Sequence, residues 1–227
     1  MSVPLHWIAQ EHLKDSAVSG FRRAFAGSKV GLLVIDDFLS REVAVALQTF
    51  LTSKAEFEER FGTYEHGDVA ESEWMARPDA ERMFHFQSVR AARASCELDP
   101  ETLLFLRFRQ SVLAGSLNQW FSEVTGLEFS RTTNPHAHRY EKGNFLREHT
   151  DNALGRKLAV IVYLVGDFTT TSGGALAVRQ DGCLVERVVP QFNRATFFDV
   201  TRNEHLIEPF SQGAESVQRL SIGWWLA

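Results

Sequence analysis

The segment FLREHTD, residues 145–151, places acidic residues and a histidine five residues before the apolar run KLAVIVYLV. Because side chains two residues apart in a strand share a face, His149 and Asp151 are expected to point one way and Glu148 and Thr150 the other. A neutral imidazole and a carboxylate on one face can bind a divalent metal ion. A solvated strand end with a His–Asp hydrogen bond would explain the same pair, so both interpretations stay open.

Three later features bear on this choice. His205 begins another predicted strand in NEHLIEPF and offers a third ligand; two histidines and one carboxylate form the facial triad that leaves coordination positions open on Fe(II). In RLSIGWWLA, Arg219 and Ser221 share a face of the last predicted strand, and a buried arginine needs an anionic partner such as a carboxylate. The paired glycines of TSGGALAV allow a sharp strand start and a close backbone approach. Each feature alone could also be a surface histidine, a structural ion pair or a turn.

The elements before residue 128 are expected to be mainly helical. Apolar spacing predicts a helix over 8–26, and a short buried strand follows in KVGLLVIDDFL. A second amphipathic helix is predicted after an N-cap at Ser40. The segment DPETLLFLRFRQSVLAGSLNQWFSEVTGL predicts one long helix with Pro100 in its first turn and Gly126 at its C-cap.

The rest of the chain consists of a possible cover, residues 54–98, and the strands after residue 127, which hold the candidate reactive side chains. Residues 54–98 have mixed charge and weak periodicity, which predicts an irregular lid or cover. After residue 127, short β-branched or aromatic runs alternate with turn signals, as in PHAHRY, GALAVRQ, LVERVVP and ATFFDV. This pattern predicts a β-sandwich of jelly-roll type that follows the helices.

Composition limits the class of protein. A chain of 227 residues with 44% hydrophobic residues can form one domain with a sizeable core. Its net charge of −5 argues against a nucleic-acid partner. Cys96 and Cys183 form no CxxC pattern and are expected to be reduced. No signal peptide or membrane-spanning apolar run is evident, so we expect a cytoplasmic protein without a membrane partner, of undetermined oligomeric state.

The segments RYEKGNFLREHTDNALGRKLAVIVYLVGDFTTTSGGALAV, VVPQFNRATFFDV, NEH and RLSIGWWL together resemble the iron(II)/2-oxoglutarate-dependent oxygenases, most of all their prolyl-hydroxylase-like branch. The resemblance covers about residues 133–226; LLVIDDFLS adds a weaker similarity within 30–50, and 54–98 is unmatched. One departure is an interval between His205 and Arg219 that is longer than usual in the branch, which predicts a longer turn at 211–216.

For the fold, the resemblance implies an α+β protein with a double-stranded β-helix core, a jelly-roll or cupin-like arrangement. The core would occupy about residues 128–227, and N-terminal helices within about 1–127 would support it. Both parts would belong to a single oxygenase domain over 1–227.

For the site, the resemblance implies that His149, Asp151 and His205 bind Fe(II). Arg219, helped by Ser221, would bind the distal carboxylate of the co-substrate 2-oxoglutarate.

Five further residues are candidates for the same pocket. The resemblance places Tyr163 on the distal carboxylate and Tyr140 in the co-substrate pocket. On PHAHRY, His136 and His138 share the face of Tyr140, and one of them could contact substrate or the proximal carboxylate of 2-oxoglutarate. Trp225 shares the face of Arg219 and could form a wall on the substrate side. Ordinary core or surface positions would explain these two histidines and Trp225 equally well.

The implied activity is hydroxylation of an unactivated C–H bond by O2, coupled to oxidative decarboxylation of 2-oxoglutarate to succinate and CO2. A small amino-acid-like or natural-product substrate is favoured, because no docking module is evident and 54–98 could close over a ligand. A prolyl-type hydroxylase acting on a protein or peptide residue is the alternative. A cupin-like binding module without turnover is a third possibility, which the complete triad with Arg219 disfavours.

Overall fold

The computed structural model describes residues 7–90, 98–133, 135–165, 168, 171–210 and 217–227. Its strands are β1 (Leu32–Ile35), β2 (Phe57–Thr63), β3 (Gly67–Val69), β4 (Arg82–Val89), β5 (His136–Tyr140), β6 (Phe145–His149), β7 (Leu158–Tyr163), β8 (Leu176–Gln180), β9 (Cys183–Val188), β10 (Arg194–Asp199), β11 (Glu204–Ile207) and β12 (Arg219–Leu226). Its helices are α1 (Asp15–Gly27), α2 (Arg41–Ser53), α3 (Glu71–Ala76), α4 (Pro100–Leu113) and α5 (Asn118–Thr125), with short 3-10 turns η1 (Gln10–Leu13) and η2 (Asp79–Glu81).

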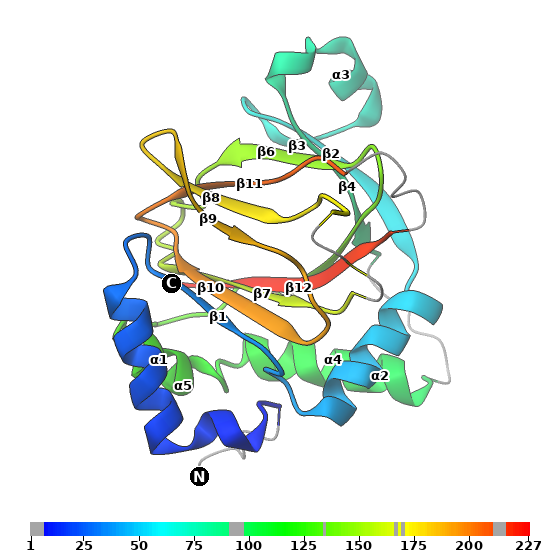
Figure 1. Ribbon diagram of the computed structural model, residues 1–227. Coiled ribbons are helices and arrows are strands. Elements are labelled where there is room, and N and C mark those ends of the chain that lie inside the picture. Colours follow the sequence, from blue (N-terminus) through cyan, green and yellow to red (C-terminus); the bar gives the residue numbers. More distant parts are fainter. Residues whose placement is uncertain (1–6, 91–97, 134, 166–167, 169–170, 211–216) are drawn as a thin grey trace.

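The strands form two facing layers (Figure 1). They pair in the order β1-β10-β7-β12-β5-β4-β6-β11-β8-β9, and every pair is antiparallel. One layer holds β1, β10, β7, β12 and β5, the other holds β6, β11, β8 and β9, and β4 joins them by pairing with both β5 and β6. The chain crosses between the layers repeatedly from β5 to β12, as the predicted double-stranded β-helix requires.

Four helices, α1, α2, α4 and α5, lie against the outer face of the β10-β7-β12 layer (Figure 1). Strand β12 shows how the sequence produces this. Leu220, Ile222 and Trp224 belong to the core that the helices cover, and burial of such side chains contributes about 1.5–3 kcal/mol each. The alternate residues Arg219 and Ser221 are also buried but line the space between the layers.

The first two helices confirm the predicted elements with changed boundaries. The helix expected over 8–26 is divided into η1 and α1, which begins at Asp15. Helix α2 begins at Arg41 with Ser40 at the N-cap, although the Ser40 side chain makes no capping hydrogen bond.

The single long helix expected from Asp99 is wrong. Helix α4 starts at Pro100 as predicted but ends at Leu113, and α5 begins at Asn118. Gly115 lies between them with φ of 74°, a left-handed conformation that a glycine adopts without steric cost and that ends a helix. Gly126, with φ of 76°, closes α5 as predicted.

The irregular structure expected over 54–98 is wrong for its described residues, 54–90 and 98. This stretch holds β2, β3, α3 and β4, and β4 pairs with β5 through Gln87 and Ser88 and with β6 through Phe84 and His85. Within RMFHFQSV, Phe84 and Phe86 alternate with His85 and Gln87, a short strand signal that the mixed charge around it obscured. The segment therefore forms part of the sheet that closes one side of the molecule.

Some predictions fall on parts that the structure does not describe. Cys96 and the longer turn at 211–216 lie outside the described residues. Cys183 is a free, exposed thiol at the start of β9. Among the helices of the described ranges, none has the length and apolar character needed to span a bilayer. The cytoplasmic location stays a prediction.

Candidate metal centre

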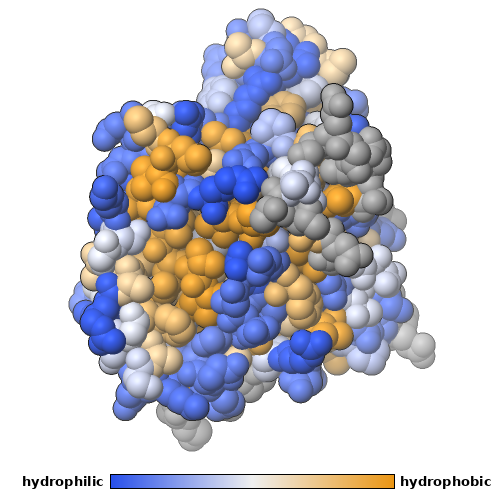
Figure 2. Space-filling view, in the orientation of Figure 1, coloured by the Kyte–Doolittle hydropathy of each residue, from blue (hydrophilic) through white to orange (hydrophobic). Residues whose placement is uncertain are grey.

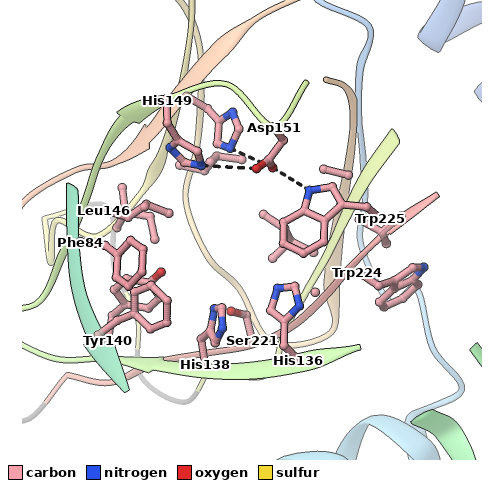
Figure 3. A pocket seen from close by; sticks show the side chains of 18 of the residues that line it. Phe84, His136, His138, Tyr140, Leu146, His149, Asp151, Ser221, Trp224 and Trp225 are labelled. Atoms are coloured by element: carbon pink, nitrogen blue, oxygen red, sulfur yellow. Dashed lines mark hydrogen bonds and ion pairs between the residues drawn. The ribbon is translucent and has the colours of Figure 1, made fainter. Parts of the chain in front are cut away.

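The three predicted metal ligands converge between the layers. His149 ends β6, Asp151 follows it, and His205 on β11 stands opposite His149 in the strand register. His149 Nε2 lies 3.6 Å from Asp151 Oδ1, and His205 Nε2 lies 3.4 Å from Asp151 Oδ2 (Figure 3). One ligand atom of each residue falls within 4.8 Å of the others. Two imidazoles and one carboxylate at this spacing suit Fe(II), which fits the implied metal.

Hydrogen bonding fixes one of these ligands in its metal-binding form. The carbonyl of Arg147 can only accept, so His149 Nδ1, 2.9 Å away, carries the proton. The lone pair therefore sits on Nε2, the atom that faces Asp151. A backbone carbonyl that orients a ligand imidazole in this way is a frequent feature of metal sites.

The protonation states of Asp151 and His205 also favour metal binding. Burial disfavours ionisation of the Asp151 carboxyl, but the neighbouring His149 and His205 outweigh that effect and hold its pKa well below its usual range. Burial lowers the pKa of the His205 imidazole, and the neighbouring Asp151 carboxylate only partly offsets this. A carboxylate beside a neutral imidazole is the combination that a divalent metal requires.

A second group of residues lies across the same cavity on β12 and its neighbours. Arg219 is 2% exposed, and its guanidinium carbon lies 5.1 Å from the Tyr140 ring and 5.0 Å from the Tyr163 ring. Within the described ranges, Arg219 Nε and the Tyr163 hydroxyl have no hydrogen-bond partner although both are buried. Buried donors without partners are costly. An anion such as the distal carboxylate of 2-oxoglutarate would satisfy both, so these residues fit the implied co-substrate.

The strand register gathers the other candidates around Arg219. Ser221 lies between His138 of β5 and Tyr163 of β7, and Arg219 is paired with Tyr140. Burial, with smaller contributions from the charges of neighbouring residues, lowers the pKa of His138 well below its usual range. Burial raises the pKa of the Tyr140 phenol. Both side chains are therefore neutral near pH 7.

The cavity that joins the two groups has a volume of about 210 Å³. Among its lining residues are the three ligand candidates, Arg219, Ser221, Tyr140, His136, His138 and Trp225 (Figure 3). Tyr163 is not among the lining residues, but its ring lies 5.0 Å from the Arg219 guanidinium carbon. The indole Nε1 of Trp225 donates a hydrogen bond to Asp151 Oδ2 at 2.8 Å, which places this residue beside the metal ligands.

Sequence reasoning missed part of the cavity wall. Met83, Phe84 and Phe86 of β4 line it, as do Leu146 and Arg156. The alternation of Phe84 and Phe86 was a usable signal, because it places both rings on one face. Arg156 had no such signal; it reaches the site from the loop after Asp151 and lies 3.9 Å from the centre of the Trp225 ring.

Two family models match the chain. One, for an oxoglutarate and iron-dependent oxygenase degradation C-terminal domain, matches residues 2–174. The other, for the 2OG-Fe(II) oxygenase superfamily, matches residues 135–227, which include all three ligand candidates and Arg219.

Two relatives match a shorter part of this chain than the longer family model does. The chain is 31% identical over 122 residues to prolyl 3-hydroxylase OGFOD1 of Xenopus laevis and 30% identical over 113 residues to that of Mus musculus. These matches cover 50% and 47% of the chain but only 23% and 20% of the relatives' own length. The chain thus corresponds to about a quarter or less of each relative.

Solved structures share the fold. A Pseudomonas putida prolyl-4-hydroxylase superimposes with a TM-score of 0.60 at 16% identity, covering 92% of this chain and 97% of that chain. A Trichoplax adhaerens prolyl hydroxylase, solved with a peptide of the hypoxia-inducible factor, gives a TM-score of 0.59 at 17% identity, with 96% and 95% coverage.

Proposed function

Since the chain belongs to the oxoglutarate- and iron-dependent oxygenases, we propose that it uses Fe(II), 2-oxoglutarate and O2 to hydroxylate a residue of a protein or peptide. The observation that supports this proposal is a single cavity with a group of metal-ligand candidates at one end and a buried arginine at the other. His149, Asp151 and His205 converge at one end. At the other, Arg219 is buried with a donor that has no partner in the described ranges.

Each end would hold one component. His149, Asp151 and His205 would bind Fe(II), and Arg219 with Tyr163, Ser221 and Tyr140 would bind the distal carboxylate of 2-oxoglutarate. When bound together, the metal and 2-oxoglutarate would activate O2, which is the oxidant: 2-oxoglutarate would be oxidised to succinate and CO2 with one oxygen atom, and the other oxygen atom would be transferred to a C–H bond.

The chain's own residues orient the reactants and exclude water. Arg219 and the Tyr163 hydroxyl would fix one end of 2-oxoglutarate through charge-assisted hydrogen bonds. Phe84 and Phe86 form an apolar wall, with ring centroids 4.7 Å apart, that limits the access of water. His138 lies 4.4 Å from the Phe86 ring as a neutral imidazole and can donate or accept one hydrogen bond without adding charge.

A peptidyl substrate replaces the small molecule that the sequence favoured. The small-molecule interpretation rested in part on the ability of 54–98 to close over a ligand, whereas this stretch contributes strands to the sheet. The matched relatives are named prolyl 3-hydroxylases, which makes a prolyl residue of a protein the first candidate for this chain as well.

The test is turnover with peptides. The protein, loaded with Fe(II) and 2-oxoglutarate in air, would be incubated with a library of proline-containing peptides and with copies in which alanine replaces proline. We expect one added oxygen on a prolyl residue, matched by an equal amount of succinate, and neither product with His205→Ala. Oxygen added only to free amino acids or other metabolites, or no stimulation of succinate formation by any peptide, would contradict the proposal.

A further inference from the structure

Trp225 occupies an unusual position in the cavity. It lies on β12 with Arg219 and Ser221 on the inward face, whereas its neighbour Trp224 turns toward the helices (Figure 3). Its indole Nε1 donates to Asp151 Oδ2 at 2.8 Å, the shortest contact that the Asp151 carboxylate makes among the described residues. A wall for the substrate would not need this bond.

Neighbouring groups hold the indole ring in place. The His136 ring lies 4.7 Å from it at an interplanar angle of 32°, and the Arg156 guanidinium carbon lies 3.9 Å from its centre. Gly223 makes room for His136, because a Cβ at this position would come within 3.1 Å of His136 Nε2. Stacking restricts ring rotation, so the direction of the N–H group toward Asp151 is set before any ligand binds.

The carboxylate has competing orientations. Asp151 Oδ1 faces His149 Nε2 at 3.6 Å and Oδ2 faces His205 Nε2 at 3.4 Å, so without another contact either oxygen could turn toward the metal. Arg156 Nη1 is 3.8 Å from Oδ1, too far for a hydrogen bond. The indole is a neutral donor, so it engages one oxygen without neutralising the carboxylate.

We propose that Trp225 is a positioning residue that holds Asp151 through Oδ2 and leaves a single oxygen, Oδ1, for the metal. The proposal rests on the metal site of the proposed function. It assigns Trp225 a role in metal binding in place of the substrate wall expected from the sequence. Bonds from neighbouring residues to ligand carboxylates generally change metal affinity by about 10–100-fold when they are removed.

The experiment measures metal binding without turnover. Metal-free protein would be titrated with Co(II), whose visible absorption reports both occupancy and ligand geometry, in the absence of 2-oxoglutarate. Trp225→Phe keeps an aromatic ring and removes the N–H donor. We expect a 10–100-fold weaker Co(II) midpoint and an altered absorption band. A midpoint within twofold of wild type with an unchanged band would overturn the proposal.

Trp224→Phe is the matched control. It is the adjacent tryptophan on the same strand, its indole Nε1 is buried without a partner in the described ranges, and its ring packs against the helices. We expect its Co(II) midpoint to equal that of wild type. An equal weakening in both variants would assign the effect to the loss of ring volume and overturn the role of the N–H group.

A third variant keeps the test decisive if Trp225→Phe does not fold. Replacing Trp225 with 3-benzothienylalanine preserves the shape of the indole and substitutes sulfur for the N–H group. The same weakening of the Co(II) midpoint is expected, and an unchanged midpoint would overturn the proposal. Failure of the wild-type protein to bind Co(II) would instead count against the metal site itself, so the two outcomes are distinguishable.

Discussion

The two ends of the cavity differ in how their polar groups are buried. At the metal end, His149, Asp151 and His205 contact one another, and the Arg147 carbonyl and the Trp225 indole bind two of them, while His205 Nδ1 is buried without a partner among the described residues. At the co-substrate end, Arg219 Nε and the Tyr163 hydroxyl are buried without partners in the described ranges.

This difference predicts that one end contributes to the stability of the ligand-free protein and that the other end gains its stability only when an anion binds. The metal end already satisfies most of its polar groups within the protein, so its geometry should persist in the absence of ligands. The co-substrate end carries an uncompensated desolvation cost that an anion would remove. A ligand bound there gains affinity because the protein has already ordered the donors. The space-filling view shows both apolar and polar residues on the face turned toward the viewer (Figure 2).

The largest expected effect is loss of the metal. His149→Ala or His205→Ala leaves two protein ligands of three, so Fe(II) should no longer bind stoichiometrically and succinate formation should cease. Anaerobic Fe(II) titration and a succinate assay measure both. His85→Ala is the matched control, because His85 bonds Glu59 on the opposite face of β4 from the cavity-lining Phe84 and Phe86. Stoichiometric Fe(II) and wild-type turnover in either ligand variant would show that the assigned residues are wrong.

The next effect concerns stability at the co-substrate end. Arg219→Met removes a buried charge and keeps a long apolar chain, so the ligand-free protein should become more stable by about 1–4 kcal/mol. At roughly 2–4 °C per kcal/mol for a chain of this size, thermal unfolding in buffer without dicarboxylates would detect the change. A lower midpoint than wild type would indicate that Arg219 belongs to a structural ion pair.

The smallest predicted effect is a dependence of stability on pH. Burial depresses the pKa of His138 below its unfolded value of 6.5, and the charges of His136, Arg219 and Arg60 act in the same direction. The unfolded chain therefore binds more protons below pH 6.5, and the metal-free protein should lose stability as the pH falls through that value. The contribution of one group is at most about 1.4 kcal/mol per pH unit.

His138→Phe should flatten this dependence in part, because the depressed pKa of His205 contributes in the same range. Urea unfolding of metal-free wild type and variant between pH 5 and 8 would measure it. Identical pH profiles would show that His138 titrates normally.

The local patterns of the sequence predicted three ligand candidates, which the structure brings together, and most of the β-core. The spacing of His149 and Asp151 and the alternation in β12 depend on neighbours along one strand, so a single sequence reveals them. The insertion of β4 between β5 and β6 depends on pairing between distant segments, which propensity does not encode.

Local sequence patterns also could not predict the contacts that complete the site, because these contacts join segments that are distant along the chain. Trp225 and Asp151 are 74 residues apart, and their hydrogen bond exists only because β12 and the end of β6 face one another across the cavity. The sequence placed Trp225 on the correct face but gave no indication of its partner. Similarly, the apolar pattern on both sides of Gly115 favoured one continuous helix, although the structure ends α4 before this residue.

The most direct test is to titrate 2-oxoglutarate into anaerobic Fe(II)-loaded protein and follow the metal-to-ligand absorption band. Wild type should develop the band, and Arg219→Ala should raise the midpoint by one to several decades while Fe(II) still binds, because a charge-assisted contact of roughly 2–5 kcal/mol is lost. Arg219→Lys should fall between them, since an ammonium keeps the charge but loses the planar fork. A wild-type protein without the band, or an unchanged midpoint in Arg219→Ala, would contradict the assignment of the cavity.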